Sequence, residues 1–102
     1  MKLEDLIEII DNRAVADPAE SWTANLLSKG PEKCAEKFGE EAIEAIIEAV
    51  KGDNKALIYE GADVIYHYLV MLKARNINFD DVMKELKSRT NMSGIKEKEN
   101  RS

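Results

Sequence analysis

Apolar residues recur at intervals of three and four along almost the whole 102-residue chain, and no run alternates as a half-buried strand would. This spacing predicts an all-α fold. A single domain of this length buries only a limited fraction of its surface. We therefore expect a bundle of four to five helices, built round an antiparallel two-helix hairpin and completed by dimerisation.

Glycine, proline and short polar segments mark the expected helix boundaries. A short first helix carries Leu3, Leu6, Ile7, Ile9 and Ile10. Asp17-Pro18-Ala19-Glu20 then has the pattern of a helix start, with Asp17 as N-cap, Pro18 at the first helical position and Glu20 three residues after the cap. Two long helices are expected over about 32–50 and 55–75, with a turn at 51–54 between them, and a last helix from near Asp80.

Residues 1–89 form the one predicted domain, and the polar segment 90–102 is a C-terminal tail that we expect to be mobile. The net charge of −5 argues against binding to nucleic acid or to an anionic membrane. Acidic residues interrupt the N-terminal apolar run, so it is no signal peptide. The segment 56–72 is too short and too acidic for a membrane span. We expect a cytoplasmic protein, and its single cysteine, Cys34, excludes an intrachain disulfide or a cysteine zinc cluster.

The first long helix carries an unusual acidic stripe. Residues 38–50 contain four acids and no base. Helical geometry places the acids within an arc of about 100°: Glu40, Glu41, Glu44 and Glu48. Like charges four residues apart destabilise an isolated helix by roughly 0.2–0.5 kcal/mol per pair. For this helix taken alone, a solvated acidic face is the ordinary interpretation.

The second long helix is different, because residues 56–72 contain no Lys or Arg and show apolar or aromatic residues on every side. This pattern predicts a largely buried helix. Glu60, Asp63 and His67 nevertheless lie along one stripe of it. Buried carboxylates without partners are costly or become protonated.

A shared divalent cation would neutralise both acidic stripes if they face each other. The predicted metal ligands are two pairs at i,i+3 spacing: Glu41, Glu44, Glu60 and Asp63. Carboxylate oxygens suit Mg²⁺, with Mn²⁺ as a substitute, and would leave positions for phosphate and a water nucleophile. A di-iron site fits poorly, because such bundles use Glu-x-x-His and the single histidine here follows Asp63 by four residues.

Three segments resemble the phosphoribosyl-ATP pyrophosphohydrolase family, within the all-α (MazG-like) nucleoside triphosphate pyrophosphatase superfamily. They are Ser21-Trp22-Thr23, Lys37-Phe38-Gly39-Glu40-Glu41-Ala42-Ile43-Glu44, and Tyr59-Glu60-Gly61-Ala62-Asp63-Val64-Ile65-Tyr66-His67. The carboxylate pairs alone indicate only the superfamily, whereas Ser21-Trp22-Thr23 together with the segment from Lys37 to Glu44 is much more specific to this family. Gly61 stands where the family pattern has alanine, which affects helix stability rather than a ligand.

The resemblance implies Mg²⁺-dependent hydrolysis of phosphoribosyl-ATP to phosphoribosyl-AMP and pyrophosphate, the second step of histidine biosynthesis. Glu41, Glu44, Glu60 and Asp63 would be catalytic as the metal ligands. Glu40 would be either a further ligand or the base that orients the water.

Five other residues are candidates for binding the substrate: Lys37, Lys33, Arg13, Ser21 and Thr23. Each has a structural alternative. Lys37 is placed to pair with Glu41 at i,i+4 spacing. Lys33 and Arg13 have the ordinary role of solvated surface bases. Ser21 and Thr23 are equally suited to cap or brace the helix that follows.

Two other functions compete with this one. The first is a house-cleaning nucleoside triphosphate pyrophosphohydrolase of the MazG or dUTPase type, using the same metal chemistry. The second is a non-enzymatic acidic helical module that only dimerises.

Overall fold

The computed structural model describes residues 1–90, 98–99 and 101, and within them it contains five helices and no strand. The helices are α1 (Leu3–Ala14), α2 (Trp22–Ser28), α3 (Pro31–Lys51), α4 (Asn54–Ala74) and α5 (Phe79–Arg89). The all-α prediction is confirmed. Most of the predicted tail lies outside the described residues. Among these residues, no helix combines the length and the apolar character needed to cross a bilayer.

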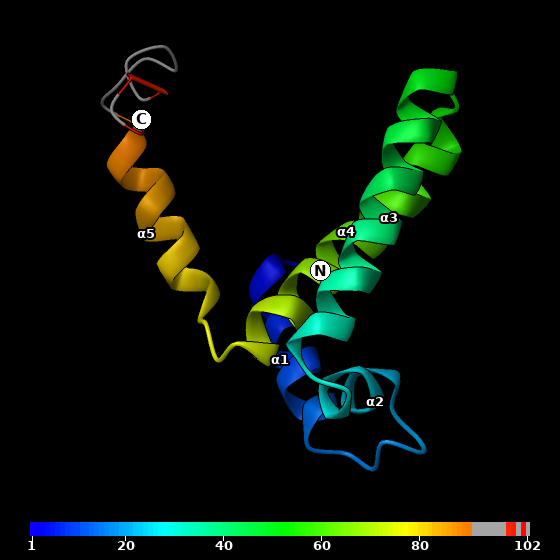
Figure 1. Cartoon of the computed structure of the whole chain (residues 1–102), viewed down its shortest axis with the longest axis vertical. Helices are drawn as coiled ribbons and strands as arrows, with labels where there is room; N and C mark the ends of the chain where they lie inside the picture. The colour runs from blue at the N-terminus through cyan, green and yellow to red at the C-terminus, as the bar shows by residue number, and fades with distance from the viewer. Residues whose placement is uncertain (91–97, 100, 102) are drawn as a thin grey trace.

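The predicted antiparallel hairpin is confirmed as α3 and α4, which lie side by side along their length (Figure 1). Gly52 ends α3 with a left-handed backbone, φ 80°, a conformation that glycine adopts without steric cost. Asp53 then starts α4, because its carboxylate accepts a hydrogen bond from the Ala56 N–H at 3.0 Å. Two residues therefore suffice to reverse the chain between the two long helices.

The predicted helix start at Asp17 is wrong. The Asp17 carboxylate accepts from the Ala19 N–H at 2.9 Å, and its carbonyl accepts from the N–H groups of Glu20 and Ser21. These bonds close a local turn over residues 18–20 instead of a helix. Ser21 is the true N-cap, and its hydroxyl oxygen accepts from the Ala24 N–H at 3.1 Å as α2 begins at Trp22.

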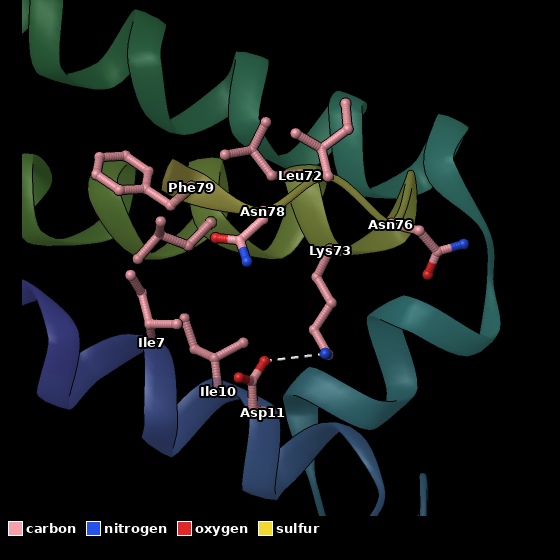
Figure 2. A pocket seen from close by; sticks show the side chains of 10 residues that line it. Ile7, Ile10, Asp11, Leu72, Lys73, Asn76, Asn78 and Phe79 are labelled. Atoms are coloured by element: carbon pink, nitrogen blue, oxygen red, sulfur yellow. Dashed lines mark ion pairs between the residues drawn. The ribbon is translucent and has the colours of Figure 1, made fainter. Parts of the chain in front are cut away.

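Helix α1 lies against the last turns of α4. An ion pair joins them, with Lys73 Nζ 2.9 Å from Asp11 Oδ1 (Figure 2). A cavity of about 300 Å³ lies beside this pair, and Phe79 at the start of α5 forms part of its wall. None of the acids on the predicted metal stripes lines this cavity.

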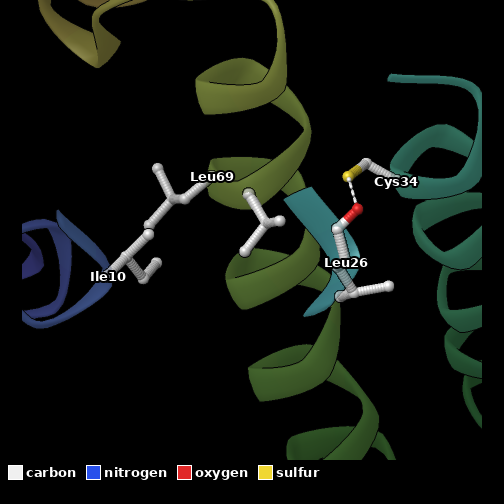
Figure 3. Close-up of a cluster of buried hydrophobic side chains, with 5 residues drawn as sticks. Ile10, Leu26, Cys34 and Leu69 are labelled. Atoms are coloured by element: carbon white, nitrogen blue, oxygen red, sulfur yellow. Dashed lines mark hydrogen bonds between the residues drawn. The ribbon is translucent and has the colours of Figure 1, made fainter. Parts of the chain in front are cut away.

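The core lies at the end of the hairpin where α1 and α2 pack on it. Its buried apolar side chains come from four helices (Figure 3): Ile10, Leu26, Cys34, Leu69 and Val70. Cys34 is a free cysteine, as expected, and its thiol donates to the Leu26 carbonyl at 3.4 Å. Burying these side chains stabilises this end of the molecule by about 1.5–3 kcal/mol for each large one.

The expectation that the second long helix is buried is wrong for the single chain. Ile58 and Tyr59 of α4 are 75% and 70% exposed, and Ile65 is half exposed. Helix α3 also exposes large apolar residues toward the hairpin tip: Ile43, Ile46, Ile47 and Val50. The physical reason is that α1 and α2 cover only the other end of the hairpin, so this half consists of two helices without a third layer.

Candidate metal centre

Three of the four predicted metal ligands converge between α3 and α4. Glu41, Glu60 and Asp63 each offer a carboxylate oxygen, and these oxygens lie within 4.8 Å of one another. The i,i+3 spacing of Glu60 and Asp63 puts both on the side of α4 that faces Glu41. All three side chains are half-buried, and they form the one such group in the described residues.

Glu44, the fourth predicted ligand, lies beside this group and is exposed. Its side chain lies close enough to those of Glu60 and Glu41 to raise the pKa of both, so it belongs to the same cluster without being one of the three converging oxygens. Its place one turn after Glu41 on α3 puts it at the solvent side of the centre. The structure therefore brings three of the four predicted ligands together with Glu44 beside them, and their role as metal ligands stays a prediction.

The crowding of the acids changes their proton affinity. Desolvation, followed by a hydrogen bond and the negative charge of Glu44, raises the pKa of Glu60 to about 7. Desolvation also raises the pKa of Glu41, with the charges of Glu44 and Asp63 as the next causes. A bound cation would therefore stabilise the ionised form of both carboxylates.

The donor set fits a hard divalent cation. Oε2 of Glu60 is buried and has no hydrogen-bond partner, which is costly for a carboxylate oxygen. Within the described part of the chain, no ion pair joins Glu41, Glu44, Glu60 or Asp63 to a base. Oxygen-only coordination is the preference of Mg²⁺ and Mn²⁺.

Two acids of the α3 stripe are not part of this centre. Glu40 pairs with Lys37 at 3.0 Å, and Glu48 pairs with Lys51 at 3.6 Å. The expectation that the whole stripe lacks protein counter-ions is thus wrong for these two, because lysines just outside residues 38–50 reach back by i,i+3 contacts. The alternative pairing of Lys37 with Glu41 is also wrong.

The other predicted substrate-binding residues lie outside the carboxylate cluster. Lys33 pairs with Glu36 at 3.4 Å, and Arg13 is exposed near the end of α1. Ser21 caps α2 and donates its hydroxyl to the Arg13 carbonyl at 3.0 Å, as its structural alternative predicted. Thr23 is 1% exposed and its hydroxyl bonds to the Tyr66 hydroxyl, so it braces α2 against α4.

His67, expected from its spacing either to partner Asp63 or to pack in the core, is buried one turn after Asp63 on α4 and bonds to the Asp63 main chain. Its Nδ1 lies 2.8 Å from the Asp63 carbonyl oxygen, so the ring donates its Nδ1–H to that oxygen. Its Nε2 is buried and has no hydrogen-bond partner in the described residues. The i,i+4 spacing of Asp63 and His67 was the signal available in the sequence.

Comparison with known proteins identifies the family. The family model for phosphoribosyl-ATP pyrophosphohydrolase matches residues 3–90. The chain is 67% identical to a protein named phosphoribosyl-ATP pyrophosphatase from Ruegeria pomeroyi, over 94% of this chain and 91% of that one. It is 64% identical to a protein of the same name from Roseobacter denitrificans, over 99% and 96% of the two chains. With all four cluster acids inside the matched region, the chain belongs to the phosphoribosyl-ATP pyrophosphohydrolase family.

Proposed function

We propose that this chain hydrolyses phosphoribosyl-ATP to phosphoribosyl-AMP and pyrophosphate, with Mg²⁺ held by Glu41, Glu44, Glu60 and Asp63. Water adds to the α-phosphorus, the bond from that phosphorus to the α–β bridging oxygen breaks, and pyrophosphate leaves. The observation that carries the proposal is the convergence of three carboxylates without a base, inside a chain of this family. The reaction would be the second step of histidine biosynthesis, in the cytoplasm.

Mg²⁺ at this site would neutralise the triphosphate and lower the pKa of a bound water. The chain contributes by holding its acids ready for that cation. Glu60 keeps Oε2 buried without a protein partner, and Glu41 lies across from it on α3. The His67 ring donates a hydrogen bond to the Asp63 carbonyl, which ties the imidazole to the turn of α4 that carries Asp63.

Cationic help for the phosphates comes most directly from Lys37. Its ammonium lies 3.0 Å from Glu40, one turn before the cluster on the same helix. Exchange of the Glu40 carboxylate for a substrate phosphate would keep that ammonium paired throughout. Glu40 then acts as the resting partner of Lys37, in preference to the roles of further ligand or base.

The uncovered half of the hairpin supports a homodimer as the working form. Its large exposed apolar residues lie on both helices toward the tip. A second copy is the occupant with a matching surface, because a two-fold contact places the same patch of both chains together.

The test is pyrophosphate release from phosphoribosyl-ATP, ATP, dCTP and dUTP, each measured with Mg²⁺ and with excess chelator. We expect release from phosphoribosyl-ATP in Mg²⁺ and none in chelator. A clear preference for a plain nucleotide would instead support the house-cleaning activity. Full activity in chelator would contradict the metal, while leaving the substrate assignment intact.

A further inference from the structure

The hairpin tip carries two uncovered apolar stripes, and they point in opposite directions. On α3, Ile43, Ile46, Ile47 and Val50 fall within an arc of about 100°. That arc is centred roughly half a turn from the side that bears Phe38 and Glu41, which face α4. On α4, Ile58 and Ile65 lie about 140–160° round the helix from Glu60 and Asp63, which face α3.

One hairpin-to-hairpin contact cannot cover both stripes. A two-fold contact packs a patch of one chain against the same patch of the second chain. Packing α4 against α4 would therefore leave the α3 stripe exposed to solvent. An exposed stripe of four branched apolar residues is the kind of patch that marks an interaction surface. A second covering element is therefore needed for the α3 stripe.

Helix α5 is the described helix that stands apart. It leads away from the hairpin of its own chain (Figure 1), and only its first residue, Phe79, packs against the core. Its apolar residues follow i, i+3, i+4 and i+7 spacing, the pattern of a helix that buries one face: Phe79, Val82, Met83 and Leu86. Met83 and Leu86 are nevertheless 47% and 51% exposed.

We propose that α5 is a clasp that packs its apolar face on the α3 stripe of a second copy, outside the hairpin-to-hairpin contact. The inference rests on the proposed dimer and extends it. The α5 helix of each copy would pack on the other copy, so the apolar face of α5 in one chain covers the α3 stripe of its partner, and the reverse. The chain thereby needs no further protein to complete its fold.

The shape of the single chain fits this arrangement. The radius of gyration is 15.7 Å, whereas a self-contained domain of about 100 residues has one of about 13 Å. The projecting part of the hairpin and α5 both contribute to this excess (Figure 1).

Disulfide trapping between two differently tagged chains tests the clasp directly. One chain carries Met83→Cys or Leu86→Cys, and the other carries Ile43→Cys or Ile47→Cys, so any bond between the new thiols joins two copies. Ser88→Cys is the matched control, because it lies on the opposite side of α5. We expect the best of the four pairs to exceed the Ser88→Cys control by at least about tenfold, since a disulfide forms only between closely placed Cβ atoms.

The outcomes separate the clasp from the dimer. A wild-type chain that sediments as a monomer at all concentrations overturns both. A wild-type dimer in which no pair exceeds the control overturns the clasp alone. Preferential bond formation within a doubly substituted single chain, Ile47→Cys with Leu86→Cys, also overturns it, because α5 would then dock on its own hairpin.

Sedimentation gives a second measurement that does not depend on thiol geometry. Leu86→Asp puts a charge on the apolar face of α5, and Ser88→Asp puts the same charge on its far side. We expect Leu86→Asp to weaken dimerisation by at least about tenfold and Ser88→Asp to leave it within about twofold. Equal effects of the two substitutions would contradict the clasp.

Discussion

Lys37 pairs with Glu40 at 3.0 Å, whereas Glu41, the next residue, makes no ion pair with any base that the structure describes. This division sorts two adjacent acids into different roles. Glu40 neutralises a lysine at the edge of the site, while Glu41 joins Glu60 and Asp63 in the cluster. The two positions therefore offer a matched pair of substitutions.

We predict that Glu41→Gln lowers kcat for phosphoribosyl-ATP by at least about 100-fold, because it removes a ligand oxygen from the reacting centre. Glu40→Gln removes an exposed ion pair and should lower kcat by less than about tenfold. Steady-state kinetics at saturating Mg²⁺ measures both. Equal losses at the two positions would contradict the separate roles.

Without metal, stability should fall as the pH rises. The pKa of Glu60 is about 7 in the folded chain against an ordinary value of 4.5, so the folded state holds this proton more tightly than the unfolded state. The raised pKa of Glu41 acts in the same direction. Stability is then greatest at the acidic end of this window, and the melting temperature in chelator should fall between pH 4.5 and about 7.

Thermal unfolding in chelator across this pH range measures how steeply the melting temperature falls with rising pH. Glu60→Gln should flatten this slope, because the amide does not titrate, and the variant should melt above wild type at pH 8. Glu48→Gln lies outside the cluster and should keep the wild-type slope. A wild-type melting temperature that rises steadily from pH 4.5 to 7 would contradict this assignment.

The buried hydroxyl pair of Thr23 and Tyr66 should contribute to stability as a unit. Thr23→Val leaves the Tyr66 hydroxyl without its partner and should lower the free energy of unfolding by about 1–3 kcal/mol. Combining Thr23→Val with Tyr66→Phe should cost less than the sum of the two single changes. A urea-unfolding double-mutant cycle measures this coupling, and strict additivity would show that the bond contributes nothing.

Cys34 should be inert in the folded protein. Its thiol is buried against the Leu26 carbonyl, and burial raises its pKa, so little thiolate forms. We predict that a colourimetric disulfide reagent reacts at least about 100-fold more slowly with the native chain than with the chain in urea. Similar rates in both states would mean that this part of the core opens readily.

The sequence predicted the helices best where the turn residues and the apolar periodicity indicate the same element. The Gly52-Asp53 turn and the periodicity of the two long helices led directly to the hairpin. Asp17 was misread because an aspartate that caps a helix and one that closes a turn show the same local pattern. Periodicity could not single out Ile58 as exposed in the single chain, because it shows which residues are apolar and not what covers them.

The candidate site was predictable to a similar extent. Helical spacing was enough to bring Glu41, Glu60 and Asp63 together, once the two stripes were taken to face each other. Spacing could not choose between Glu40 and Glu41 as the partner of Lys37, because both lie within its reach. The bond from Thr23 to Tyr66 spans 43 residues and depends on how α2 packs on α4.

The central claim is that the cluster acids bind a divalent cation, and a titration of thermal unfolding with Mg²⁺ tests it most directly. Wild type and Glu48→Gln should gain about 2.7 kcal/mol of stability at a Mg²⁺ concentration 100 times the Kd, whereas Asp63→Asn should gain far less at that concentration. An equal gain for Asp63→Asn and wild type, or no gain for wild type, would contradict the metal centre.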